Sequence, residues 1–146
     1  MFTSSQGRKS AYMAFFQLPF LPEALFRSER GGRRVLGAFE AAGLPPDDAA
    51  GALAMLRRGA LTPALHWYRA LPIGARRPTG PSRVRTLYVW ASGDVALGRR
   101  AAELTAEHVE APYRFEVLDG VGHFVLEEAP DRVASLLVDH LPAPAA

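Results

Sequence analysis

The chain has 146 residues, of which 49% are hydrophobic and 22% charged; these are ordinary values for one soluble domain, and they exclude a disordered tail, a collagen-like fibre and a coiled coil. Its 17 basic and 15 acidic residues give a net charge of +2, and they are mixed along the chain without the basic stripe that is typical of a nucleic-acid binder. The absence of cysteine excludes a disulfide framework, a thiolate zinc site and a cysteine nucleophile.

The N-terminal region loosely resembles a signal peptide, because Arg8 and Lys9 precede an apolar run over residues 11–16. Prolines at 19 and 22 interrupt this run, and no small-residue cleavage site follows. No stretch approaches the ~18–20 apolar residues that a membrane span needs. We therefore expect a cytoplasmic protein that has neither a membrane nor a nucleic acid as partner.

Residues 1–75 are predicted to be helical, because apolar residues recur there at helical spacing. The first set, expected on one helix face, is Tyr12, Phe15, Phe16 and Phe20. Further helices are predicted over residues 22–26, over 35–42 up to Gly43, from Asp47 onwards, and over 61–71. Proline at a first helical position, glycine after a last one and acidic residues in a first turn support these boundaries.

Residues 84–146 alternate between strand and helix patterns, and a loop rich in proline and glycine over 76–83 precedes them. Strands are predicted over 85–90 and 113–118, with a helix over 97–108 between them and a last helix that begins near Pro130 and reaches Leu141. The apolar first strand is typical of a parallel sheet that is covered on both faces. The predicted fold class is therefore α/β, a helical region followed by a β-α-β-α unit.

Two polar residues follow the two predicted strands. Asp94 comes after the first strand, and His123 comes after the glycine turn that ends the second. Because parallel strands end at the same edge of a sheet, we expect these side chains to lie close together. A carboxylate beside an imidazole fixes its tautomer and supports its action as a base. An exposed loop aspartate and a histidine satisfied by the backbone remain the structural alternative.

Several blocks of the sequence resemble α/β-hydrolases, most closely the epoxide hydrolase and haloalkane dehalogenase-like branch. The blocks, in chain order, are residues 12–19 (YMAFFQLP), 67–69 (WYR), 87–97 (LYVWASGDVAL), 120–124 (GVGHF) and 127–133 (EEAPDRV). They cover nearly the whole chain from about residue 8 to residue 141. The resemblance implies a helical cap over residues 1–75, a linker over 76–83 and the C-terminal part of the hydrolase core over 84–146.

The resemblance also implies roles for individual residues. Asp94 matches the acid that orients the histidine, His123 matches the histidine that activates water, and Tyr12 and Tyr68 match the two cap tyrosines that donate hydrogen bonds to the epoxide oxygen. A tyrosine hydroxyl stays protonated at neutral pH and can stabilise an alkoxide. Read without the resemblance, both tyrosines are aromatic core residues. The remaining residues expected to contact substrate are Phe16, His66, Trp67 and Phe124. No cofactor and no metal is expected.

The nucleophile and the oxyanion hole of this family precede the cap, and the sequence contains no Gly-x-Ser-x-Gly elbow and no predicted strand before residue 12. We therefore expect the chain to retain the acid–base half of a hydrolase that acts on a small apolar epoxide or ester-like electrophile, with little turnover alone. The unpaired edge of the first strand predicts self-association or a partner that supplies the N-terminal half. The alternatives are a non-catalytic binding module derived from a hydrolase cap and a start assigned too far downstream in a longer gene.

Overall fold

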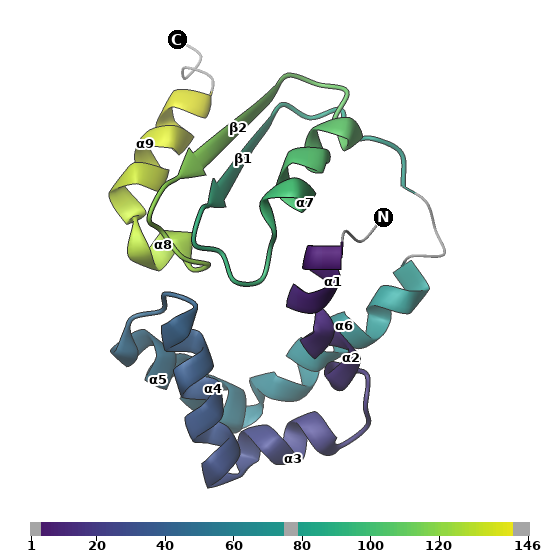
Figure 1. Ribbon diagram of the computed structural model, residues 1–146, viewed down its shortest axis with the longest axis vertical. Helices are drawn as coiled ribbons and strands as arrows, with labels where there is room; N and C mark the ends of the chain where they lie inside the picture. The colour runs from purple at the N-terminus through teal and green to yellow at the C-terminus, as the bar shows by residue number, and fades with distance from the viewer. Residues whose placement is uncertain (1–3, 75–78, 142–146) are drawn as a thin grey trace.

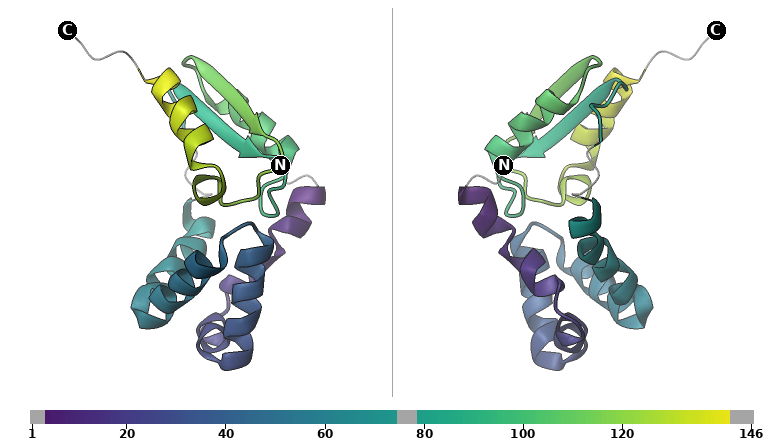
Figure 2. Two further views of the ribbon diagram at one scale, coloured as in Figure 1. Left: turned by 90° about the vertical axis from the view of Figure 1, so that its left-hand side faces the viewer. Right: turned by 90° about the vertical axis from the view of Figure 1, so that its right-hand side faces the viewer.

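The computed structural model describes residues 4–74 and 79–141. Figure 1 shows the helices of residues 4–74 at one end of the molecule and the strands with their covering helices at the other. Figure 2 shows the same separation from two further sides. No helix within the described ranges is long and apolar enough to cross a membrane.

The first end of the molecule is built from helices alone. In chain order they are α1 (Ser4–Lys9), α2 (Ala11–Phe16), α3 (Leu21–Arg27), α4 (Glu29–Ala41), α5 (Pro46–Met55), the π-helical turn η1 (Leu56–Ala60) and α6 (Leu61–Gly74). Three predicted boundaries are confirmed. Pro22 lies in the first turn of α3, Asp47 in the first turn of α5, and Gly43 follows α4 with a φ of 102°. That φ belongs to the left-handed region, which glycine adopts without strain.

The prediction for Phe20 is wrong. The helix that carries Tyr12 and Phe16 ends at Phe16, and Phe20 has a φ of 63° and is 82% exposed. Pro19 disfavours helical backbone at the residue before it, and Pro22 then begins the next helix. Phe20 is therefore the residue before α3 and does not share the face of the aromatic residues on α2.

The second end contains two parallel strands, β1 (Thr86–Ala91) and β2 (Tyr113–Leu118), aligned so that Thr86 pairs with Tyr113 and Ala91 with Leu118. The chain crosses between them through α7 (Arg99–Glu103) and the 3-10 turn η2 (Leu104–His108), and it ends in α8 (Val125–Glu128) and α9 (Pro130–His140). Helices α7 and α9 lie on opposite sides of the strand pair (Figure 2). The α/β class and the parallel β-α-β-α order are thereby confirmed.

Two details of this end differ from the prediction. The crossover helix begins at Arg99 and not at Leu97, because Leu97 belongs to the loop after β1, where its carbonyl accepts a hydrogen bond from Trp90 Nε1 (3.1 Å). Within the predicted linker, Ser82 forms a parallel bridge with Val109 and so extends the strand pairing. The linker residues 75–78 lie outside the described part of the chain.

Each end has its own hydrophobic core, and the two cores share no residue. The helical end packs around Phe26, Val35, Leu53, Leu61 and Leu65. The strand end packs around Ala91, Leu118, Val121, Ala129 and Val133. The two ends therefore meet mainly through loops and side chains, and this junction contains the candidate site.

Candidate active site

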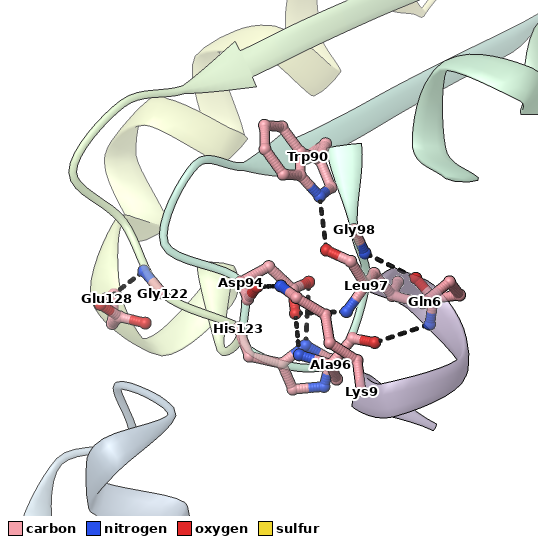
Figure 3. A network of polar contacts seen from close by, with 10 residues as sticks. All are labelled: Gln6, Lys9, Trp90, Asp94, Ala96, Leu97, Gly98, Gly122, His123 and Glu128. Atoms are coloured by element: carbon pink, nitrogen blue, oxygen red, sulfur yellow. Dashed lines mark hydrogen bonds and ion pairs between the residues drawn. The ribbon is translucent and has the colours of Figure 1, made fainter. Parts of the chain in front are cut away.

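Asp94 and His123 form a hydrogen-bonded pair at the ends of β1 and β2, where the sequence predicts them. The distance between His123 Nδ1 and Asp94 Oδ2 is 3.0 Å, and Figure 3 shows the two side chains facing each other between the loops. The Asp94 side chain is buried, whereas that of His123 is 36% exposed. Because a carboxylate can only accept, Nδ1 carries the proton, and the lone pair of Nε2 is left to accept one from water.

The second oxygen of Asp94 holds its own loop together. Asp94 Oδ1 accepts hydrogen bonds from the backbone N–H groups of Ala96 (2.7 Å) and Leu97 (2.8 Å). This arrangement is a turn in which an aspartate side chain bonds the backbone two and three residues further on. With Oδ1 occupied by the loop, Oδ2 is fixed in the direction of His123.

The loop that carries His123 is held by hydrogen bonds to Ala42 at the helical end and to Glu128 on α8. His123 N–H donates to the carbonyl of Ala42 at the end of α4 (2.8 Å), and Gly122 N–H donates to Glu128 Oε2 (3.0 Å). A Cβ at position 122 would lie 2.7 Å from that Ala42 carbonyl oxygen, which is closer than real contacts allow. Glycine is therefore required where the histidine loop meets the helical end.

Helix α1 holds the Asp94 loop through two side chains that the sequence patterns do not indicate. Gln6, which is buried, donates to the carbonyl of Ala96 (2.9 Å) and accepts from Gly98 N–H (2.7 Å). Lys9 Nζ donates to the carbonyl of Asp94 itself. Figure 3 shows both side chains reaching from α1 into this loop. The contacts span about ninety positions of sequence, so no local signal predicts them.

Tyr12 on α2 and Tyr68 on α6 lie side by side, with ring centroids 5.9 Å apart in an edge-to-face arrangement. Burial raises the pKa of Tyr12 to about 12, and the neighbouring Tyr68 and Asp94 contribute to this rise. The Tyr12 hydroxyl therefore remains a hydrogen-bond donor at every physiological pH.

Arg69 ties the two tyrosine helices to each other and to α3. Its guanidinium donates to the carbonyls of Phe16 (3.2 Å) and Leu18 (2.9 Å) after α2 and to both carboxylate oxygens of Glu23 (2.8 and 3.1 Å) on α3. A bidentate pair of this kind, in which one guanidinium donates to both oxygens of one carboxylate, fixes the relative orientation of the two side chains. Arg69 thus positions Tyr12 relative to Tyr68 without touching either hydroxyl. It follows Tyr68 directly in the sequence, but nothing in the pattern indicates this role.

The tyrosines and the histidine open onto one cavity of about 600 Å³. Most of its wall is apolar: the aromatic members are Tyr12, Phe15, Phe16, Phe26, Phe39, Tyr68 and Phe124, with His123 and Arg34 as the ionisable side chains besides the tyrosines. A volume of this size, mostly apolar with a few convergent polar groups, is typical of small-molecule sites. The structure thus brings six predicted site residues together: Asp94 behind the wall, and Tyr12, Phe16, Tyr68, His123 and Phe124 in it.

The other two residues predicted to contact substrate, His66 and Trp67, lie away from this cavity, and their role stays a prediction. His66 and Trp67 do not line the cavity, and Trp67 is 82% exposed. The reason is helical geometry: on α6 the inward side is set by Leu65 and Tyr68, and the two residues between them turn away from it. Sequence reasoning also missed Phe39 and Arg34 as cavity residues, although the spacing of Phe39 from Val35 already places those two on one face of α4.

Known proteins match both the sequence and the fold. The sequence profile of the alpha/beta hydrolase family matches residues 4–136. The AB hydrolase superfamily protein YfhM of Bacillus subtilis is 33% identical over 93% of this chain and 49% of its own length. Epoxide hydrolase 3 of Xenopus tropicalis is 28% identical over 94% of this chain and 40% of its own. The crystal structure of epoxide hydrolase A from Mycobacterium thermoresistibile superimposes with a TM-score of 0.73 at 23% identity, covering 97% of this chain and 57% of that one.

The chain therefore spans about half the length of the relatives that it matches. Within that half, the profile match runs from the first helix to α9 and includes the loops that carry Asp94 and His123. The parallel strand pair, the helices on both of its sides and the helical end are those of the superimposed hydrolase structure. On this combined evidence the chain belongs to the alpha/beta hydrolase family.

Proposed function

We propose that this chain supplies the cap and the acid–base half of an epoxide hydrolase-like active site, and that a nucleophile from outside these 146 residues completes it. One observation carries the proposal. Tyr12, Tyr68 and His123 share the wall of one apolar cavity, and Asp94 bonds His123 from behind. The names of the relatives from Xenopus tropicalis and Mycobacterium thermoresistibile point to the same chemistry.

In the first step, a nucleophile attacks an epoxide carbon and the carbon–oxygen bond of the ring breaks. The negative charge that develops on the ring oxygen is stabilised by hydrogen bonds from the hydroxyls of Tyr12 and Tyr68. With a pKa of about 12, Tyr12 is fully protonated in the resting site and donates its proton only as the more basic alkoxide forms. The mostly apolar wall strengthens these hydrogen bonds because it lowers the local dielectric constant.

In the second step, water cleaves the covalent intermediate. His123 Nε2 takes a proton from that water, and Asp94 stabilises the resulting imidazolium through Nδ1. For an ester formed with a carboxylate nucleophile, the hydroxide adds to the carbonyl carbon and the ester carbon–oxygen bond breaks. The departing alkoxide takes the proton of the added hydroxide, which releases the diol and restores the carboxylate, and the proton held by His123 returns to the tyrosine that protonated the ring oxygen. His123 is exposed enough to reach such a water from the cavity.

Exposed apolar side chains and strand edges support the proposal that further protein segments complete the site. Trp67 and Leu71 lie one helical turn apart on the same face of α6 and are 82% and 50% exposed. Among the described residues the sheet has two strands, so each strand has one edge without a partner. Large exposed apolar side chains and free strand edges favour association.

We therefore expect the purified chain to self-associate. Sedimentation velocity over a wide concentration range should show dimers or larger species, and adding the complementary half of a relative should replace them with a one-to-one complex. A single monomeric species at all concentrations, unchanged by the complement, would contradict this expectation.

Hydrolysis assays test the proposed function directly. The chain alone should turn over neither an apolar epoxide nor an aryl ester, and activity should appear when it is co-expressed with the half of the Bacillus subtilis relative that it does not cover. His123→Gln should abolish that activity, whereas Arg132→Gln, an exposed change outside the site, should leave it intact. Turnover by the chain alone, or an active His123→Gln complex, would reject the proposal. Ligand binding in the cavity with no hydrolysis in any complex would favour a non-catalytic binding module.

A further inference from the structure

Arg34 is a strongly basic side chain in the cavity wall, and no charged partner is found for it in the part of the chain that the structure describes. Within the described residues it forms neither a hydrogen bond nor an ion pair, and no acidic side chain lines the cavity. Arg34 is exposed, and an arginine at such a position can lay its stem on apolar surface while its charged head stays accessible. Because Arg34 lines the cavity, a ligand bound there lies within reach of its side chain.

The position of Arg34 along α4 gives the length of that ligand. Arg34, Ala38 and Ala42 line the cavity at intervals of four residues, so they lie along one face of the helix. The last of them accepts the hydrogen bond from His123 N–H. Eight residues of helix separate Arg34 from Ala42, which corresponds to about 12 Å along the axis at 1.5 Å per residue. The part of the wall at Arg34 and the part at Ala42, beside His123, are thus separated by about the length of a medium acyl chain.

The surroundings of Arg34 strengthen its attraction for an anion. A second hollow of about 370 Å³ beside the first is lined by Arg30, Arg33 and Arg34. None of these three arginines has a hydrogen-bond or ion-pair partner among the described residues, and no acidic side chain lines this hollow either. Three unpaired guanidinium groups within two turns raise the local positive potential. Of the three, only Arg34 also belongs to the wall of the large cavity.

We propose that Arg34 binds the anionic end of an amphipathic substrate, a carboxylate whose apolar chain fills the aromatic cavity and whose reactive carbon lies at the end near Tyr12, Tyr68 and His123. A planar guanidinium matches a carboxylate with two parallel hydrogen bonds. The assignment of the reactive end rests on the proposed function. The assignment of the anion site rests on Arg34 and the cavity alone.

Binding of unreactive ligands to the 146-residue chain tests the anion site. Octanoate and the neutral octanamide have the same chain length and differ in charge, so calorimetric titration of each, with the NMR shifts of Ala38 and Ala42 as the local readout, compares the two head groups at one site. Octanoate should bind about fivefold more tightly, since a hydrogen bond to a charged group exceeds a neutral one by about that factor. Arg34→Gln should abolish the preference and leave octanamide binding unchanged.

Arg33→Gln is the matched control, because it removes the same charge from the next position of α4 without changing the cavity wall. It should reduce the octanoate preference by less than Arg34→Gln does. Equal binding of the two ligands, a preference retained in Arg34→Gln, an equal loss in Arg33→Gln, or no binding of octanoate would each overturn the proposal. These results are independent of catalysis: a charge preference in an inactive complex would reject the proposed function alone, and hydrolysis without a charge preference would reject Arg34 alone.

Discussion

The two ends of the molecule build their parts of the site by different means. At the strand end, Asp94 and His123 are placed by the ends of two parallel strands, and the turns after these strands are closed by hydrogen bonds from backbone N–H groups to carboxylate and carbonyl oxygens. At the helical end, Tyr12 and Tyr68 are placed by side chains: ring packing and the bonds of Arg69 set their spacing. The strand ends therefore place Asp94 and His123, with tertiary support from Gln6 and Ala42, whereas the positions of the two tyrosines depend on tertiary side-chain contacts throughout.

The largest expected effect follows from the separate cores. Leu65 on α6 is almost completely buried in the helical core, and Leu65→Ala should reduce the opening free energy of that end by about 2–5 kcal/mol. Hydrogen exchange should show faster exchange in α2, α4 and α6 while β1 and β2 keep their protection. Leu71→Ala, a change of the same type on the half-exposed part of α6, should have little effect. Equal loss of protection at both ends would show that the molecule has one cooperative core.

A smaller effect is expected where α1 joins the two ends. Gln6→Ala removes both hydrogen bonds to the loop after Asp94 and leaves two partly buried backbone groups without these partners. It should cost about 1–3 kcal/mol of local stability, measured as faster exchange of the Gly98 amide. Arg8→Ala, on the same helix and exposed, is the control. An unchanged Gly98 amide in Gln6→Ala would mean that the loop holds itself without α1.

The smallest expected effect concerns pH and the helical end alone. The hydrogen bonds from Arg69 lower the pKa of the Glu23 carboxyl below its ordinary 4.5, so the unfolded chain binds more protons than the folded one at acid pH. The resulting stability is present above pH 4.5 and is lost as the pH falls through the lower folded pKa. Thermal unfolding should therefore show a decrease in stability on acidification that Glu23→Gln and Arg69→Met both reduce. An identical acid profile in all three proteins would disprove a contribution from this pair.

The same contrast explains what the sequence could predict. The strands, the acid loop and the pairing of Asp94 with His123 follow from local patterns and from the rule that parallel strands end at one edge. The position of Phe20 depends on two flanking prolines, which override its helical spacing from Phe16. Three features depend on where whole helices pack: the exposure of the Trp67 side chain, the hydrogen bonds from Gln6 to the Asp94 loop, and the position of Arg34 in the cavity wall. Contacts of that kind have no signature in a single sequence.

The central claim is that the helical end acts on ring opening and the strand end on release of the intermediate. Intact-mass spectrometry of the complemented protein after mixing with an apolar epoxide tests it most directly. His123→Gln should accumulate an adduct of the mass of the epoxide, because attack still occurs and water is no longer activated. In the His123→Gln background, adding Tyr12→Phe and Tyr68→Phe should prevent this accumulation, because the ring oxygen loses both donors. Accumulation in the triple variant, or no adduct in His123→Gln, would contradict this division between the two ends.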